Sequence, residues 1–200
     1  MRAQPHVWWL ASRASGVLAL VLVTVSVAIG LAMSAKLMRK RKLGPALMAV
    51  HEQTALAGLL AIGVHGVTLL GDPWLHASVA GISVPFVIGY RTVFTGLGII
   101  AGWLAAILGL SFYFRKHIGA KLWRKAHRAT FLVWLLGMVH TIGAGTDAST
   151  PWLREFMVIT GVAMTVLFAR RLYGSDRVVL GRPVARGRLV ETKALDQVSA

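Results

Sequence analysis

The sequence predicts an all-α integral membrane protein with about five transmembrane helices. Of its 200 residues, 56% are hydrophobic and only 14% are charged, whereas an ordinary soluble domain is about 25% charged. Several long apolar segments contain few charges or none, and the basic residues gather between them. These observations exclude a soluble globular domain, a disordered chain and a coiled coil.

The first apolar segment, Ala14–Met33, has twenty residues without a charge, which is about the length needed to cross 30 Å of hydrocarbon. The segment Val79–Tyr90 is also apolar, but its twelve residues are too few to cross, so we expect it to be interfacial or re-entrant. A signal peptide is the alternative for residues 1–33, although the apolar run is long for one and Ala32-Met33-Ser34 is a poor cleavage site. The expected organisation is an N-terminal outer segment 1–13, a transmembrane domain 14–172 with spans at about 14–33, 45–71, 92–114, 126–144 and 152–169, and a basic tail 173–200.

The formal net charge of +15 indicates topology rather than nucleic-acid binding, because 18 of the 22 basic residues fall on one side of the expected spans. By the positive-inside rule that side is cytoplasmic. We therefore expect a multi-pass protein of the cell membrane, with its N-terminus outside, its C-terminus in the cytoplasm and the lipid bilayer as its environment. The residues expected near the outer helix ends include four tryptophans, which favour the membrane interface: Trp8, Trp9, Trp74 and Trp152.

Histidine is the main candidate ligand, because the chain has no cysteine for a disulfide, an iron–sulfur cluster or a zinc–thiolate site. His51 and His65 lie 14 residues apart on the second expected span, about 21 Å and nearly on one face. His127 and His140 lie 13 residues apart on the fourth, about 19.5 Å. Both spans run outward, so His51 and His127 share an inner level (the first pair), and His65 and His140 share an outer level (the second pair). Two bis-imidazole sites stacked across the membrane follow, since ionisable residues in spans are rare and mark function.

One spacing departs from an ideal helix, because a 13-residue step turns roughly 220° and puts His127 and His140 on different faces. Either the cofactors approach this helix from different sides, or the helix is locally overwound or underwound. The alternative for all four residues is an ordinary polar contact between helices.

Small and aromatic residues near the histidines fit a cofactor, but they fit ordinary packing as well. Glycines 58, 63 and 66 surround His65 and would let a flat ring approach the backbone. Phe131 and Trp134 lie between the two histidines of the fourth span and are candidates for aromatic groups between two cofactors.

The stretch Trp123-Arg124-x-x-His127-Arg128, followed by His140, resembles the ferric reductase-like transmembrane domain. This family includes NADPH oxidases, iron metalloreductases and the haem-binding subunit of bacterial methionine sulfoxide reductase. The resemblance covers roughly residues 10–170 and implies two b-type haems as cofactors. It implies that His51 and His127 bind the inner haem iron, and that His65 and His140 bind the outer one.

The resemblance further implies transmembrane electron transfer from an inner-side donor to an outer-side acceptor, as a component of an oxidoreductase. Many family members have six spans rather than five, and the larger ones carry a flavin and nicotinamide module. Only about 30 residues follow the fifth span here, without a dinucleotide fingerprint. We therefore expect a separate flavoprotein or a quinol as donor, while the acceptor is open. Candidate partners for the haem propionates are Arg124 and Arg128 on the inner side and Arg91 on the outer side.

Two other functions stay open from the sequence. In one, the chain is a quinone-linked cytochrome b anchor of a partner oxidoreductase, with Glu52 handling a proton beside His51. In the other, the chain has no redox role and its histidines bind zinc or copper. A closed zinc site usually needs four ligands, which two-histidine levels do not supply.

Overall fold

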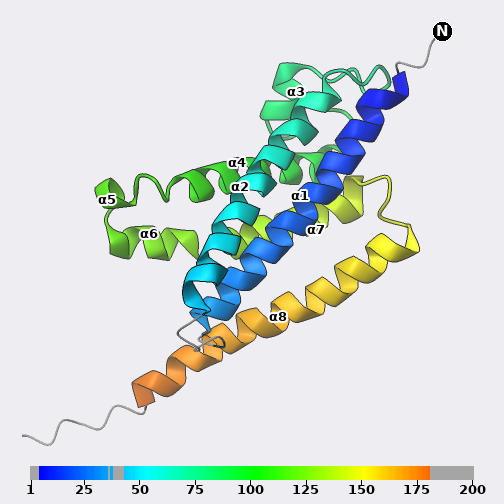
Figure 1. Ribbon diagram of the computed structural model, residues 1–200. Coiled ribbons are helices and arrows are strands. Elements are labelled where there is room, and N and C mark those ends of the chain that lie inside the picture. Colours follow the sequence, from blue (N-terminus) through cyan, green and yellow to red (C-terminus); the bar gives the residue numbers. More distant parts are fainter. Residues whose placement is uncertain (1–4, 36, 38–42, 181–200) are drawn as a thin grey trace, which may run out of the picture.

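The computed structural model describes residues 5–35, 37 and 43–180, and all secondary-structure elements in this part of the chain are helices (Figure 1). Long helices alternate with short connecting ones. In chain order they are α1 (Pro5–Ser34), α2 (Gly44–Leu69), α3 (Val79–Ser83), α4 (Thr92–Leu110), α5 (Arg115–Ile118), α6 (Ala120–His127), α7 (Thr130–Ala144) and α8 (Pro151–Leu180).

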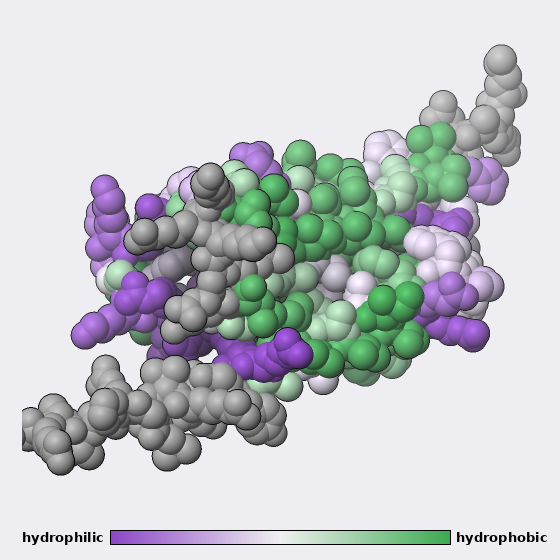
Figure 2. Space-filling model, turned by 60° about the horizontal axis from the view of Figure 1, so that its bottom comes forward, coloured by the Kyte–Doolittle hydropathy of each residue, from purple (hydrophilic) through white to green (hydrophobic). Residues whose placement is uncertain are grey.

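Four of the helices are long and apolar enough to cross a membrane. These candidate spans are α1 from His6, α2, α4, and α8 as far as Leu172. Figure 2 shows an apolar middle with hydrophilic residues gathered towards both ends of the molecule. The expected fourth span, 126–144, is interrupted, because α6 ends at His127 and α7 begins at Thr130. With 15 residues, α7 alone is shorter than the roughly 20 residues that a crossing needs.

The ends of three spans differ from the sequence-based expectation. Helix α1 begins at Pro5 instead of Ala14, and Arg13 lies within it and pairs with Asp147. Helix α4 ends at Leu110. In the turns that follow, backbone amides donate to the carbonyls three residues earlier instead of four. Helix α8 continues to Leu180, past the expected end of its span. The basic residues at positions 36 and 39–42, and those from 182 onward, lie outside the described residues.

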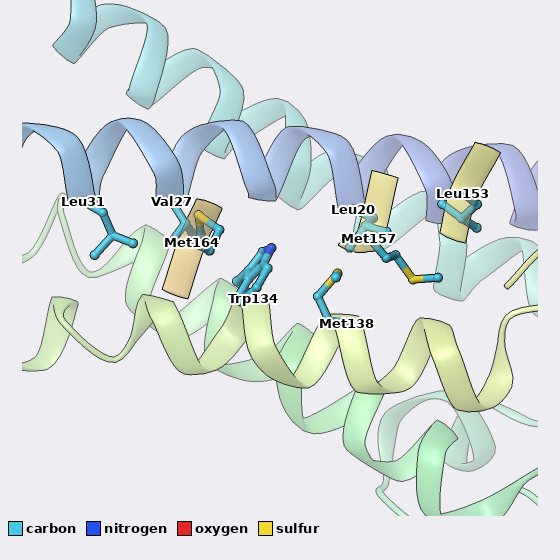
Figure 3. Packing of buried hydrophobic residues seen from close by; sticks show 8 residues of the cluster. All are labelled: Leu20, Val27, Leu31, Trp134, Met138, Leu153, Met157 and Met164. Carbon is cyan, nitrogen blue, oxygen red and sulfur yellow. The ribbon is translucent and has the colours of Figure 1, made fainter. Parts of the chain in front are cut away.

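The long helices form two closely packed pairs, α1 with α2 and α4 with α7 (Figure 1). Helix α8 packs against α1 of the first pair and against α7 of the second pair. The buried contacts there come from α1, α7 and α8: Leu20, Val27, Leu31, Trp134, Met138, Leu153, Met157 and Met164 (Figure 3). This cluster joins the two pairs along one side.

The short helices belong to the connections at the ends of the bundle. Helix α3 lies in the segment expected to be interfacial, and the Ser78 hydroxyl caps it by accepting from the Gly81 amide at 3.0 Å. The chain reverses between α5 and α6 at Gly119, whose φ of +86° is a conformation that favours glycine. These turns return the chain towards α7 and so position His127.

Candidate functional site

The four histidines of the expected spans come together in the two pairs that the sequence predicts. The ring centroids of His51 and His127 are 6.1 Å apart, and those of His65 and His140 are 6.2 Å apart. The ring planes are nearly perpendicular, at 86° and 75°. Each pair takes one histidine from α2 and one from the segment that spans α6 and α7, so the site lies between the two helix pairs.

The 13-residue step between His127 and His140 is accommodated by overwinding at the junction of α6 and α7. The amides of Arg128, Ala129 and Leu132 each bond to a carbonyl three residues back rather than four, as in a 3₁₀ turn. Each such residue adds about 20° of rotation. Three of them bring the two histidines from roughly 220° to within about 80° of one face. The helix is therefore locally overwound at this junction, as one of the two alternatives expects.

Backbone carbonyls hold three of the four rings. Nδ1 of His65 donates to the Ser12 carbonyl at 2.8 Å, and Nδ1 of His51 donates to the Ser26 carbonyl at 2.8 Å. Nδ1 of His140 donates to the Phe94 carbonyl at 2.9 Å. A carbonyl oxygen only accepts, so Nδ1 carries the hydrogen in each neutral ring and Nε2 keeps its lone pair. This is the tautomer that a metal ligand bound through Nε2 requires.

A glycine lies four residues after each of the three accepting carbonyls. A Cβ on Gly16 would lie 2.9 Å from Nδ1 of His65, and a Cβ on Gly30 would lie 3.2 Å from Cε1 of His51. A Cβ on Gly98 would be closer still to Nδ1 of His140. The rings of His65 and His140 therefore occupy space that a side chain would fill, and a side chain at residue 30 would make a tight contact with His51.

His127 is the exception among the four rings. The Leu108 carbonyl lies near it, but the contact falls short of a hydrogen bond. Nδ1 of His127 is buried without a partner among the described residues. The ring instead stacks on Trp123, with centroids 4.9 Å apart and planes at 24°. The Trp123 indole is held in turn by a hydrogen bond to the Ser111 hydroxyl at 3.1 Å.

A cavity of about 810 Å³ opens beside the second pair and is lined by both of its histidines. A volume of this size is within the range of cofactor pockets. Of the glycines singled out in the sequence, Gly63 and Gly66 line the cavity and face open space, as does Gly137. Gly58 instead packs against Val23 of α1. The first pair is not among the residues that line this cavity.

The three arginines expected near propionates lie outside the cavity lining. Arg124 and Arg128 are exposed on and after α6. Arg91 adopts a left-handed conformation before α4 and donates to the Gly143 carbonyl of α7. The cation that does line the cavity is Arg13, which lies over the Trp9 ring at 4.0 Å.

The two aromatic residues between the histidines of the fourth expected span differ in their surroundings. Trp134 is 4% exposed, lines the cavity and donates to the Thr24 hydroxyl at 3.1 Å. Phe131 turns to α8 and stacks on Phe168, with centroids 4.2 Å apart. Trp134 thus lies beside the space near the second pair, while Phe131 packs the bundle.

Sequence reasoning missed the residues that hold the histidines, although the signal is visible. The pattern Ser-x-x-x-Gly occurs twice on α1, at Ser12–Gly16 and Ser26–Gly30, and its repeat of 14 residues equals the spacing of His51 and His65. Within the described residues, no three His, Cys, Asp or Glu side chains gather as one metal site. The four histidines therefore form two separate pairs and not one cluster.

Comparisons with protein-family models, with curated proteins and with solved structures found no match.

Proposed function

We propose that this chain carries electrons across a membrane through two stacked b-type haems, in the manner of the ferric reductase-like domain. It would be a component of an oxidoreductase in the cell membrane, with its N-terminus outside. Electrons would pass from an inner-side flavoprotein or quinol to an outer-side acceptor. The observation that carries the proposal is the presence of two histidine pairs, each drawn from two different helical segments.

The separation of the rings within each pair fits one metal ion between them. A metal–imidazole bond of about 2 Å, plus about 1 Å from the nitrogen to the ring centre, places two opposed ring centroids about 6 Å apart. The observed separations are 6.1 and 6.2 Å. Two ligands per level suit the two axial positions of a haem, whereas a structural zinc site needs more.

When bound, haem would supply reversible one-electron chemistry at iron. The protein's own residues would set the conditions for it. His51, His65 and His140 present Nε2 with its lone pair, because their Nδ1 hydrogens are bonded to carbonyls. The apolar lining of the cavity beside the second pair would exclude water and keep the local dielectric constant low.

Absorption spectroscopy and haem quantification on the purified full chain test the proposal. We expect a reduced b-type spectrum and two haems per chain. His51→Ala and His127→Ala should each remove the same haem, and His65→Ala and His140→Ala should each remove the other. His76→Ala and His117→Ala are matched controls, because both side chains are exposed. The absence of a Soret band after expression with sufficient haem would refute the proposal.

A further inference from the structure

We propose, building on the haem function above, that Gly16, Gly30 and Gly98 are positioning residues that anchor three of the histidines, and that His127, which has no such glycine, is the exchangeable ligand. The first pair would then admit a small exogenous ligand such as carbon monoxide. The second pair would stay closed to it.

The geometry of an α-helix explains why the glycines are needed. The side chain of a helical residue points back towards the N-terminus, over the turn that contains the carbonyl four residues earlier. A side chain on residue i+4 therefore crowds a ring that approaches the carbonyl of residue i, and a glycine there leaves room for it. The three anchored rings follow this rule, with acceptor and glycine at positions 12 and 16, 26 and 30, and 94 and 98.

The carbonyl that corresponds to these acceptors at His127 lies at the end of α4, and the position four residues after it lies beyond the helix. The acceptors on α1 are 14 residues apart, and 14 residues after Phe94 on α4 is Leu108, whose carbonyl is the one near His127. Four residues further the chain has Phe112 in place of a glycine. Phe112 packs against Trp123 with centroids 5.9 Å apart, and Trp123 covers the His127 ring. The Leu108 carbonyl accepts instead from the Ser111 hydroxyl at 2.7 Å.

The difference in anchoring has a chemical consequence. A ring with a bonded Nδ1 hydrogen cannot rotate without breaking that bond, so its Nε2 stays in place. His127 stacks on Trp123 and its Nδ1 has no hydrogen-bond partner among the described residues, so this ring is freer to slide or turn. Exchange would break the bond from Nε2 of His127 to iron and form one bond from iron to the incoming ligand, with no change of oxidation state. In the second pair both rings are anchored.

The tautomers of the four rings test the anchoring without any need for bound haem. The full chain, labelled with ¹⁵N-histidine in detergent micelles, is measured by NMR through two-bond nitrogen–proton couplings, with His→Gln variants for assignment. We expect His51, His65 and His140 as Nδ1–H tautomers with slow hydrogen exchange at Nδ1. We expect faster exchange at His127. Equal behaviour of all four rings, or an Nε2–H tautomer at an anchored ring, would overturn the proposal.

Carbon monoxide titration of the dithionite-reduced haem protein tests the exchange. We expect binding to one haem per chain, and its loss in His51→Ala, which removes the first pair. Phe112→Gly should open the Leu108 carbonyl to His127 and weaken carbon monoxide binding about 10-fold, the usual lower size of an outer-shell effect. Phe114→Gly is the matched control, because Phe114 is 60% exposed nearby.

Three results would overturn the exchange: carbon monoxide binding at both haems, binding at neither, or equal effects of Phe112→Gly and Phe114→Gly. A chain without any haem spectrum would instead contradict the proposed function, and with it the exchange. The NMR result would still decide whether the glycines anchor the rings, so the two failures are distinguishable.

Discussion

Gly98 of α4 lies directly against the imidazole of His140 on α7, where a Cβ on residue 98 would overlap the ring. The ring uses that space to donate from Nδ1 to the Phe94 carbonyl at 2.9 Å. One missing side chain thus sets the position, the tautomer and the free nitrogen of a histidine on another helix.

Alanine at the three anchoring glycines should therefore weaken haem binding in a graded order. Gly98→Ala should be the most harmful, then Gly16→Ala, then Gly30→Ala, because the Cβ clash with the ring decreases in that order. We expect a loss of haem affinity of roughly 10-fold to 100-fold at the affected pair. Haem titration monitored at the Soret band measures this affinity.

Gly161→Ala on α8 is the control for that series, because a Cβ there meets nothing within 4 Å. It should leave haem affinity unchanged, and its higher helix propensity should slightly raise stability. Equal haem affinities for the Gly98→Ala and Gly161→Ala variants would show that the glycines only serve helix packing.

The sequence predicted the pairing of the histidines because depth in a membrane helix follows from residue counting alone. His51 with His127 and His65 with His140 needed only the helix rise and the direction of each span. Residue counting could not predict the junction at Arg128, because the overwinding there depends on local 3₁₀ hydrogen bonds. At the same point the described residues give four candidate spans where the sequence predicted five, because α6 and α7 are separate helices.

The start of α1 and the role of Arg13 were missed for a different reason. A charged residue next to an apolar run is normally a limit of the span, and only the tertiary structure reveals that Asp147 pairs with it. The anchoring carbonyls were missed because every residue has one. Only the glycine four residues later distinguishes a carbonyl that a ring can reach.

The hydrogen bond between Trp134 and Thr24 predicts an asymmetric pair of substitutions. Thr24→Val leaves the buried Trp134 N–H without an acceptor and should lower the free energy of unfolding by about 1–3 kcal/mol. Loss of this hydrogen bond in Trp134→Phe should lower the free energy of unfolding less, because the Thr24 hydroxyl still donates to the Leu20 carbonyl at 2.7 Å. The double variant should be more stable than the sum of the two losses predicts. Thermal unfolding in detergent, followed by circular dichroism, measures all three variants.

Asp72 closes the turn after α2 and predicts a difference between two substitutions. Its buried carboxylate accepts from the amides of Trp74 at 2.9 Å and Leu75 at 3.3 Å. Asp72→Ala leaves these amides without their acceptor, so we expect a loss of about 1–3 kcal/mol in unfolding free energy. Asp72→Asn keeps an acceptor oxygen and should lose clearly less. Equal melting temperatures for the two variants would contradict the role of this side chain in the turn.

The ion pair between Arg13 and Asp147 predicts a measurable coupling between α1 and the loop before α8. Two nitrogens of the guanidinium, Nε and Nη2, each donate to one oxygen of the carboxylate, and the side chains are only 31% and 16% exposed. A two-point pair in a partly buried position should exceed the 0.2–1 kcal/mol of typical exposed pairs, so we expect a coupling free energy of about 1 kcal/mol or more. A double-mutant cycle with Arg13→Gln and Asp147→Asn, read by thermal unfolding, measures it.

Arg154→Gln is the control, since Arg154 is exposed and forms no ion pair within the described residues. The coupling should fall only modestly at higher salt, because partly buried charges are screened less than exposed ones. A coupling free energy of zero would show that this pair does not stabilise the contact between α1 and the loop before α8.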